Sequence, residues 1–306
     1  MAAGLISAIV ISRDDGTRIL PTVRSVVEQR CDEPLEVIVV TSGTGDAAAL
    51  VRRHFANVTV VELEHPALPG EARNAGLRVA RGDYISFPGS HVELPQGSLA
   101  ARVRAHKLGH AMVTGTILNG TRTRAGWASH FLDHSTALPG RPSGVLDVPP
   151  MQCSYERNAL LSVGGFPEDM RAGEDTVVNR ELFRRGYSAY RAQDITLTHH
   201  NRCASAPQLV RHHFTRGRAF GKILRADPHR HPLFVWTYVP RRVSRTTEHV
   251  RRWGGDLWHE YRRAWLLVVA GTVTAWLGIL FELLRPMRGH ATATSPPVVA
   301  TNTRQK

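Results

Sequence analysis

ARNAGLRVARGDYISF, at residues 72–87, joins a segment of helical spacing to a short apolar run. It predicts a helix over 71–79 followed by a strand over 84–87. The chain before it repeats this order, because apolar runs alternate with helical patterns from residue 5 onward. Strands are predicted over 5–11, 36–40 and 58–63, and helices over 19–29 and 47–55. The alternation favours an α/β, Rossmann-like fold with a mostly parallel sheet flanked by helices, in which ligands bind beyond the carboxyl ends of the strands.

The positive charge of the chain is concentrated in its C-terminal third. The 306 residues carry a formal net charge of +13, but residues 1–200 contain 21 basic and 21 acidic side chains and are neutral. Residues 201–263 contain 14 basic and 4 acidic side chains. Such a section attracts either nucleic acid or an anionic membrane surface. No nucleic-acid-binding motif accompanies it, so we expect an anionic membrane surface as a partner and no nucleic acid.

An uncharged segment near the C-terminus supports the membrane interpretation. Residues 264–281, AWLLVVAGTVTAWLGILF, contain no charged side chain. As a helix, residues 264–284 would be about 31 Å long, enough to cross a hydrocarbon core of about 30 Å. We expect a transmembrane or membrane-inserted helix, and a re-entrant hairpin, an interfacial helix and a buried helix of a soluble domain remain as alternatives. The arginines before it predict that the N-terminal domain faces the cytoplasm.

Composition and these segments together predict the domain organisation. A hydrophobic content of 42% excludes wholesale disorder, and three widely spaced cysteines exclude a disulfide framework or a CxxC zinc site. A helix is expected over 208–224, and the apolar stretch 233–239, bounded by Pro232 and Pro240, suits a short interfacial segment. We therefore predict an α/β domain over 1–225, basic juxtamembrane or interfacial helices over 226–263, the membrane helix over 264–284, and a disordered tail over 285–306.

Two motifs give the chain a family resemblance. ARNAGLRVARGDYISF at 72–87 and GGFPE…GEDTVVNREL at 164–182 occur in this order, about 90 residues apart. Together with the strand–helix order, they resemble family 2 glycosyltransferases of the inverting GT-A type over roughly residues 5–225. The resemblance implies transfer of a sugar from a nucleotide-sugar donor, with inversion. Combined with the membrane segment, it predicts a lipid-linked or cell-envelope glycan as the acceptor and a catalytic domain on the cytoplasmic side of the membrane.

The resemblance also assigns site residues. An inverting transfer requires a base that deprotonates the acceptor hydroxyl. Asp175 matches the family's catalytic aspartate and Glu174 is its neighbour, although acids in a first helical turn are also ordinary dipole partners. The nucleotide-sugar contacts implied by the resemblance are Ser12, Arg13, Asp14, Thr41, Ser42, Arg73, Ser90 and His91.

The sequence departs from the family at the metal-binding and base-binding positions. Thr41 and Ser42 stand where two aspartates usually end the second strand. The DxD motif, which normally holds Mn²⁺ or Mg²⁺ on the diphosphate, is replaced by Gly89, Ser90 and His91.

Three interpretations of the altered motif remain open. His91, with Glu93 or His199, holds a softer metal such as manganese or zinc. Alternatively, His91 and Ser90 contact phosphate directly and an arginine replaces the metal. In the third, the donor site is silent and the protein is a membrane scaffold for a partner glycosyltransferase.

The region over 111–157 is where we expect the acceptor to bind. Trp127, His130, Asp133 and His134 are candidates to stack on, or hydrogen-bond to, a sugar or a lipid headgroup, and a packed lid helix is the alternative. Cys153 and Tyr155 are further acceptor-side candidates, although a packing role suits Cys153 better because nothing nearby marks a depressed thiol pKa.

Overall fold

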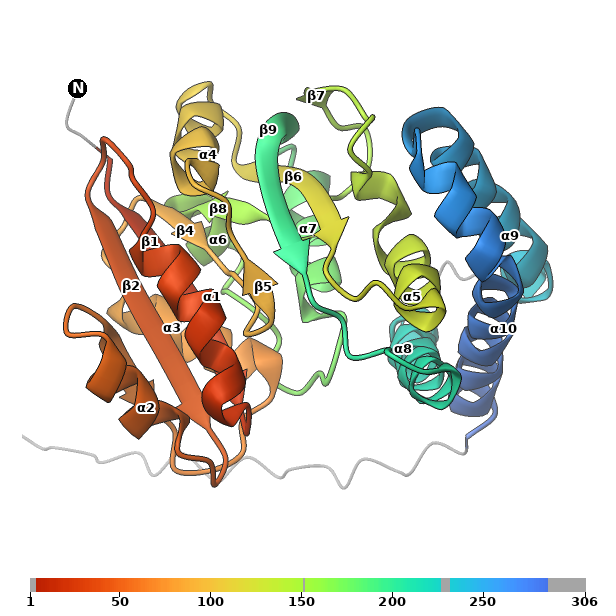
Figure 1. Cartoon of the computed structure of the whole chain (residues 1–306), viewed down its shortest axis with the longest axis horizontal. Coiled ribbons are helices and arrows are strands. Elements are labelled where there is room, and N and C mark those ends of the chain that lie inside the picture. Colours follow the sequence, from red (N-terminus) through yellow and green to blue (C-terminus); the bar gives the residue numbers. More distant parts are fainter. Residues whose placement is uncertain (1–3, 151, 227–231, 286–306) are drawn as a thin grey trace, which may run out of the picture.

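The computed structural model describes residues 4–150, 152–226 and 232–285, which form one curled nine-stranded sheet with helices around it (Figure 1). The strand order is β3–β2–β1–β4–β8–β6–β9–β5, and β7 pairs with β9. The strands are β1 (Ile6–Arg13), β2 (Leu35–Ser42), β3 (Thr59–Glu62), β4 (Tyr84–Ser86), β5 (Val92–Glu93), β6 (Met112–Asn119), β7 (Gly144–Val145), β8 (Ser154–Glu156) and β9 (Ala189–His199). The helices are η1 (Gly16–Arg18), α1 (Ile19–Val27), α2 (Ala47–His54), α3 (Pro69–Val79), α4 (Ser98–Lys107), α5 (Arg124–His134), η2 (Ser135–Ala137), α6 (Arg157–Ser162), α7 (Glu174–Arg184), α8 (Ala206–Ala226), α9 (Pro232–Trp253) and α10 (Leu257–Leu284). The predicted tail beyond Arg285 lies outside the described residues.

The first half of the sheet is parallel, as the alternation predicts. β1 pairs in parallel with β2 and with β4, and β2 pairs in parallel with β3. These strands are near-continuous apolar runs because helices cover both faces. One buried cluster includes Val23 of α1 and Leu99 of α4, and another includes Leu77 of α3 and Leu182 of α7. The carboxyl ends of β1, β2 and β3 therefore meet at one edge of the sheet.

The second half of the sheet is mixed, which corrects the mostly parallel sheet predicted from the sequence. β8 runs antiparallel to both β4 and β6, whereas β9 runs parallel to β6. β5 and β7 add short antiparallel pairings to β9. The strand–helix alternation ends near residue 87, so the pattern carries no signal for these later directions.

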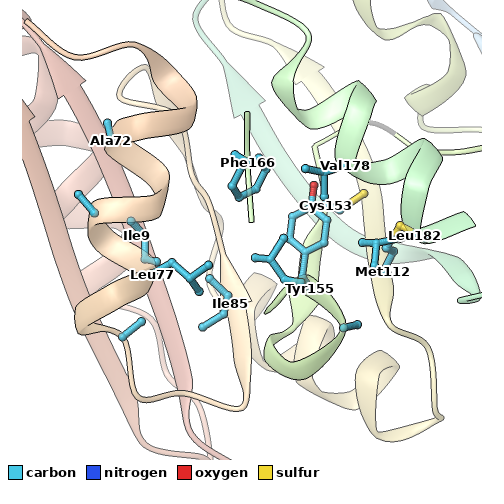
Figure 2. Packing of buried hydrophobic residues seen from close by; sticks show 14 of the residues in the cluster. Ile9, Ala72, Leu77, Ile85, Met112, Cys153, Tyr155, Phe166, Val178 and Leu182 are labelled. Atoms are coloured by element: carbon cyan, nitrogen blue, oxygen red, sulfur yellow. The ribbon is translucent and has the colours of Figure 1, made fainter. Parts of the chain in front are cut away.

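The two motifs that carry the family resemblance contact each other. Asn74 of α3 donates from Nδ2 to the backbone oxygen of Phe166 (2.8 Å) and accepts from the backbone N–H of Phe166 (2.9 Å). Figure 2 shows Leu77 of α3 and Val178 of α7 on opposite sides of the cluster that contains Tyr155 and Phe166. The start of α7 is thus fixed against α3 through shared apolar packing and one side-chain amide.

α10 contains the predicted membrane segment, but it begins at Leu257 instead of residue 264. It is long and apolar enough to cross a membrane, and 39% of its most apolar window is buried within the protein. Gly217 of α8 permits a close approach, because a Cβ atom there would lie 2.0 Å from the backbone oxygen of Ala275. Glu282 of α10 forms an ion pair with Arg218 of α8 (Oε2–Nε 3.1 Å). One side of α10 is therefore fixed to the domain, while the other exposes Trp265, Leu266, Leu277, Phe281 and Leu284.

The boundary expected at Pro240 is wrong. α9 continues through Pro240, so the segment 233–239 belongs to one long helix together with the basic residues that follow it. A proline inside a helix removes one backbone hydrogen bond, and tertiary packing offsets that cost here. The Nε1–H of Trp276 in α10 donates to the backbone oxygen of Val235 in α9 (2.9 Å). Figure 1 shows α5, α8, α9 and α10 gathered at one end of the molecule, and we call these four helices the helical layer.

Candidate active site

The adjacent acids Glu174 and Asp175 form the first turn of α7 but lie in different environments. Glu174 is buried and forms an ion pair with Arg73 of α3. Asp175 is only half-buried, and its Oδ1 accepts from the backbone N–H of Thr176 (2.8 Å). Gly173 precedes them with φ +89°, a left-handed conformation that glycine adopts without strain. Of the two carboxylates, Asp175 is therefore the more accessible to a substrate.

Arg73 is held between aromatic rings as well as by Glu174. Its guanidinium lies 5.1 Å from the ring centre of Phe166 and 5.7 Å from that of Phe87, distances at which cation–π attraction operates. We expected Arg73 to contact the nucleotide. In the structure it is the counter-charge of Glu174, and its contact with a nucleotide stays a prediction.

Cys153 and Tyr155 lie in the core beneath Asp175. The Tyr155 Oη–H donates to Oδ1 of Asn179 (2.8 Å), and Asn179 Nδ2 donates to the backbone oxygen of Pro150 (2.9 Å). Burial raises the pKa of Tyr155 and of Cys153, and the charge of Asp175 raises both further, so both stay protonated near neutral pH. These two residues support the turn that carries Asp175, and neither lies on a surface that an acceptor would meet.

A small pocket lies at the carboxyl ends of β1, β2 and β3. Thr41 and Ser42, the residues that replace the two aspartates, line it together with Asp14 and Glu62. Asp14 adopts φ +53° and accepts from the backbone N–H of Thr44 (3.0 Å). The family motifs did not predict Glu62 as a site residue. Its position near the end of the predicted third strand could have indicated it, because ligands bind beyond the carboxyl ends of parallel strands. Two carboxylates thus remain in the pocket despite the loss of the usual pair.

Ser12 and Arg13 at the end of β1 contact side chains of the following loop. The Ser12 Oγ–H donates to Oδ2 of Asp15 (3.0 Å), and buried Asp15 also pairs with the Nη2 of Arg202. Arg13 is exposed, and its Nε lies 3.8 Å from Oδ2 of Asp14. Arg202 follows β9 and was not predicted from the sequence. It brings an exposed guanidinium to the edge of the sheet where β1 ends.

His91 and His199 lie side by side, at the position of the altered metal motif. An isolated bridge between Gly89 and Ile11 extends the β1–β4 pairing, and β5 places His91 against the end of β9. The ring centres of His91 and His199 are 4.8 Å apart, and Ser90 Oγ lies 3.5 Å from Nδ1 of His91. Burial lowers the pKa of His91 to about 4 and lowers that of His199, so both rings are neutral at pH 7.

The two imidazoles fit a divalent metal of intermediate softness. Nδ1 of His199 is buried and has no hydrogen-bond partner among the residues that the structure describes, and a neutral imidazole offers a lone pair. Imidazole ligands suit Mn²⁺ or Zn²⁺ better than Mg²⁺, which prefers oxygen ligands. Glu93, the other ligand considered from the sequence, pairs instead with Nε2 of His200 (2.8 Å). A metal here would be held by His91 and His199.

The row of histidines continues into α5. The ring centre of His134 lies 4.9 Å from that of His199, and His130 lies 5.7 Å from His134. Both α5 histidines are buried and none of their ring nitrogens has a hydrogen-bond partner in the described residues. Trp127, the expected acceptor contact, stacks on Phe131 at 5.6 Å between ring centres and packs within the helical layer. The sequence analysis expected residues of α5 to contact an acceptor. In the structure, most of its side chains pack inside the protein.

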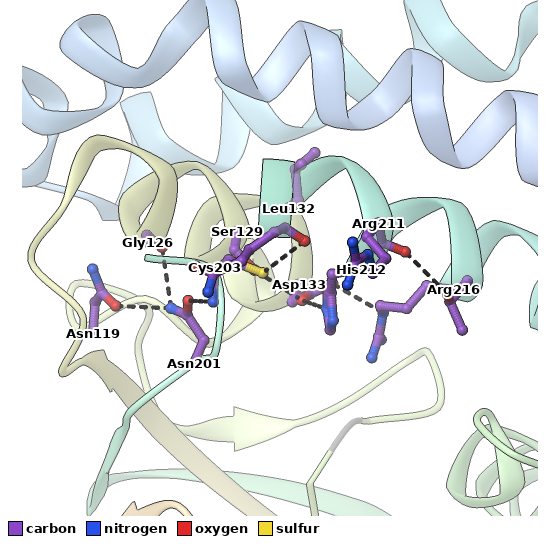
Figure 3. Close-up of polar contacts among 12 residues, drawn as sticks. Asn119, Gly126, Ser129, Leu132, Asp133, Asn201, Cys203, Arg211, His212 and Arg216 are labelled. Atoms are coloured by element: carbon purple, nitrogen blue, oxygen red, sulfur yellow. Dashed lines mark hydrogen bonds and ion pairs between the residues drawn. The ribbon is translucent and has the colours of Figure 1, made fainter. Parts of the chain in front are cut away.

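Asp133 and Arg216 connect the helical layer to the acids of α7. Asp133 is buried and pairs with Nε2 of His212 (3.2 Å) and Nε of Arg216 (3.1 Å) on α8 (Figure 3). Burial alone would raise the pKa of Asp133, but Arg216 and the two neighbouring histidines of α8 hold it well below its usual value. The pKa of Arg216 is raised first by Asp133 and also by Asp175 and Glu174. Arg216 is therefore a permanent cation within electrostatic reach of the proposed base.

The curled mixed α/β sheet, with acids at the start of α7 and a polar edge at β1–β3, defines a glycosyltransferase of the GT-A class. Residues 7–163, just over half of the chain, match the sequence profile of Glycosyl transferase family 2, and the chain belongs to this family. The protein is therefore a glycosyl transfer enzyme. Among curated proteins, none matches the sequence significantly.

Solved structures share the fold at low sequence identity. The mannosyltransferase PcManGT from Pyrobaculum calidifontis, solved with GDP-Man and Mn²⁺, is 19% identical with a TM-score of 0.62, and the match covers 90% of this chain and 87% of that one. S. aureus TarS 1–349 in complex with UDP-GlcNAc is 13% identical with a TM-score of 0.51, covering 90% of each chain. The TarS complex with UDP is 14% identical, with a TM-score of 0.52 and coverage of 90% and 91%. These likenesses show the fold.

Proposed function

We propose that this enzyme transfers a sugar from a nucleoside-diphosphate donor to an acceptor hydroxyl with inversion, and that Asp175 is the general base. The single observation that carries this proposal is the contrast within the first turn of α7. Glu174 is buried and neutralised by Arg73, whereas its neighbour Asp175 is half-buried and has no cationic partner among the described ion pairs. A base must present an unshared carboxylate to the attacking hydroxyl, and Asp175 meets that requirement.

The donor is expected to lie along the carboxyl edge of the sheet. The pocket that contains Asp14, Thr41 and Glu62 offers hydrogen-bond acceptors to a base or ribose. The neighbours with this fold were solved with GDP-Man or UDP-GlcNAc, which supports a nucleotide sugar as the donor class. Ser12 would act through Asp15, which it orients, and Ser42 would form part of the pocket wall.

The leaving diphosphate requires positive charge or a metal. Arg202 brings an exposed guanidinium to this edge, and Arg216 of α8 lies within electrostatic reach of Asp175. Ser90 and His91 lie at the same end of the sheet and are suited to hydrogen-bond a phosphate oxygen. A divalent metal held by His91 and His199 would neutralise the developing charge on the diphosphate. An arginine supplies a fixed charge to phosphate without a metal, so both modes remain compatible with these residues.

We further propose that the acceptor is a lipid-linked or envelope glycan reached at an anionic membrane surface on the cytoplasmic side. One face of α10 is fixed on α8 and α5, so the opposite face is free to lie in the headgroup layer. This face is apolar, and α9 adds Trp236, which is 74% exposed, together with a series of arginines. An amphipathic surface of this kind suits docking in the plane of the membrane. In-plane docking leaves the described contacts of α10 intact, whereas spanning would require α10 to separate from α8.

The function is tested with purified protein and detergent-solubilised membrane lipids as the acceptor mixture. Release of nucleoside diphosphate from GDP-mannose, UDP-GlcNAc and related donors is measured with Mn²⁺ and with EDTA. We expect turnover of one donor class, a product anomer opposite to that of the donor by NMR, and loss of turnover in Asp175→Asn. A product with retained configuration would refute inversion. Failure to bind any nucleotide by calorimetry would leave the silent scaffold as the function.

A further inference from the structure

Asp133, His212 and His213 form a cluster at the junction of α5 and α8 that the proposed transfer reaction does not use. Each residue offers one ligand atom, and these atoms all lie within 4.8 Å of one another. Oδ2 of Asp133 is 3.2 Å from Nε2 of His212, and Oδ1 is occupied by Arg216 (Figure 3). His213 follows on the same helix, with its ring at 90° to that of His212 and the ring centres 5.0 Å apart. One carboxylate and two imidazoles therefore surround a common point.

Neighbouring buried nitrogens without partners provide a second, independent observation. Nε2 of His213 and both ring nitrogens of His134 are buried and have no hydrogen-bond partner among the described residues. Each of these side chains is 4% exposed, and His134 is adjacent to Asp133 in α5. A buried polar atom without a partner costs free energy and calls for a ligand, an ion or an ordered water. Imidazole nitrogens held neutral by burial are competent metal ligands.

We infer that Asp133, His212 and His213 bind a divalent transition metal of the zinc type, fastening α5 to α8. Bonds of about 2.0–2.2 Å at a tetrahedral centre place two ligand atoms about 3.3 Å apart, close to the Asp133–His212 separation. The metal takes the place of the Nε2 proton between His212 and Asp133, and neutral His212 then carries its proton on Nδ1. His134 or a water molecule completes the coordination. Arg216 keeps its hydrogen bond to Oδ1 and orients the carboxylate from outside the coordination sphere.

The proposed metal uses other ligands than the pair proposed for the donor metal, although the two groups of histidines adjoin at His134 and His199. His91 directly precedes β5 and His199 ends β9, whereas Asp133 lies on α5 and His212 and His213 lie on α8. The proposed metal binds the carboxylate of Asp133, which also pairs with Arg216. Arg216 in turn interacts electrostatically with Asp175 and Glu174. Its role is to set the position of the helical layer against the catalytic half of the protein.

The test uses metal binding and does not depend on turnover. The full chain is stripped with EDTA, and Zn²⁺ binding is measured by calorimetry, with Co²⁺ substitution followed by its visible d–d absorption. We expect at least a tenfold loss of Zn²⁺ affinity in Asp133→Asn and in His212→Ala, the latter at a side chain that is 37% exposed and so tolerates truncation. Zn²⁺ should also raise the Tm of the wild-type chain but not that of these variants.

Two controls distinguish this site from the others. His54→Ala removes an exposed histidine on α2 and should leave Zn²⁺ binding unchanged. The double variant His91→Ala/His199→Ala removes the donor-side pair and should retain a Zn²⁺ equivalent with the tetrahedral Co²⁺ spectrum. Loss of all Zn²⁺ in that double variant would overturn the inference, because the metal would then belong to the donor site. It would also be overturned by a wild-type chain that binds no Zn²⁺, since buried water would then serve the histidines.

Discussion

The catalytic half and the helical layer both pair their buried carboxylates with arginines, but they differ in the other groups that they leave available. Around α3 and α7, the buried carboxylate Glu174 is matched by Arg73, and Asp175 beside it remains unpaired. In the helical layer, the ring nitrogens of buried His130 and His134 have no hydrogen-bond partner within the described part of the chain, and the outer face of α10 is apolar. The catalytic half thus leaves one carboxylate, Asp175, available for chemistry on a substrate. The helical layer, with imidazole nitrogens free of hydrogen bonds among the described residues and with an apolar outer face, is suited to bind a metal ion and a membrane surface.

The largest expected effect tests the asymmetry of the two acids. Asp175→Asn removes the proposed base, and we expect kcat to fall about 10²- to 10⁴-fold, since this is the contribution of a positioned general base. The fold should persist, because Asp175 is half-buried and its local hydrogen bond to Thr176 can be kept by an amide oxygen. The measurement is nucleotide release under saturating donor, with circular dichroism as the check on folding.

Glu174→Gln is the matched control for the base. It keeps the shape of the side chain but removes the charge that Arg73 neutralises. We expect it to lower stability more than Asp175→Asn does and to lower kcat less. Equal losses of kcat in the two variants would mean that the acids act as a pair, and the contrast within α7 would then be wrong.

The next effect concerns the ion pair itself. Arg73→Gln leaves Glu174 buried without a counter-charge, and breaking such a pair costs about 3–5 kcal/mol of unfolding free energy. Urea denaturation monitored by tryptophan fluorescence measures this loss of unfolding free energy. Arg78→Gln is the control on the same helix, because Arg78 is 64% exposed in the side chain and its contact with Glu168 is 3.8 Å long. Its expected cost is about 1 kcal/mol or less. A small loss in Arg73→Gln would show that water reaches Glu174.

The same contrast explains what the sequence could predict. Strands β1–β4 were found because buried parallel strands are continuous apolar runs separated by periodic helices, a local signal. The start of α7 was found because its motif is contiguous. The pairing of Asp133 with Arg216 joins positions 83 residues apart and leaves no periodic trace. The continuity of α9 through Pro240 likewise depends on a contact with α10. Local patterns predicted the first strands of the sheet and the helices α8 and α10, whereas tertiary contacts decide the later strand directions and the pairing of charges in the helical layer.

We expect the free energy of unfolding to decrease at acid pH because of buried histidines in the helical layer. Burial lowers the pKa of His130 to about 3, below its value of about 6.5 in an unfolded chain. A depressed folded-state pKa means that the stabilisation is complete above pH 6.5 and is lost as the pH falls toward 3. Between pH 7 and pH 5, this linkage removes about 2 kcal/mol for one such histidine.

His130→Leu isolates that contribution. It removes a titrating group and two buried nitrogens without partners, so we expect no loss of stability at pH 7 and about 2 kcal/mol less loss on going to pH 5. Urea midpoints at the two pH values measure this. His54→Leu, at an exposed position, should leave the pH dependence unchanged. An unchanged pH dependence in His130→Leu would show that His130 is already solvated in the folded protein.

The smallest effect tests the outer face of α10. Leu266 is 75% exposed there, and Leu108 is 69% exposed at the end of α4, on the opposite half of the molecule. If α10 lies in the headgroup layer, Leu266→Ser removes apolar surface worth about 1–2 kcal/mol, or about five- to thirtyfold in affinity for vesicles containing anionic lipid. Leu108→Ser changes the same surface chemistry away from the layer and should bind as the wild type does. Equal binding by both variants would indicate that the arginines alone attach the protein, and binding would then disappear at high salt.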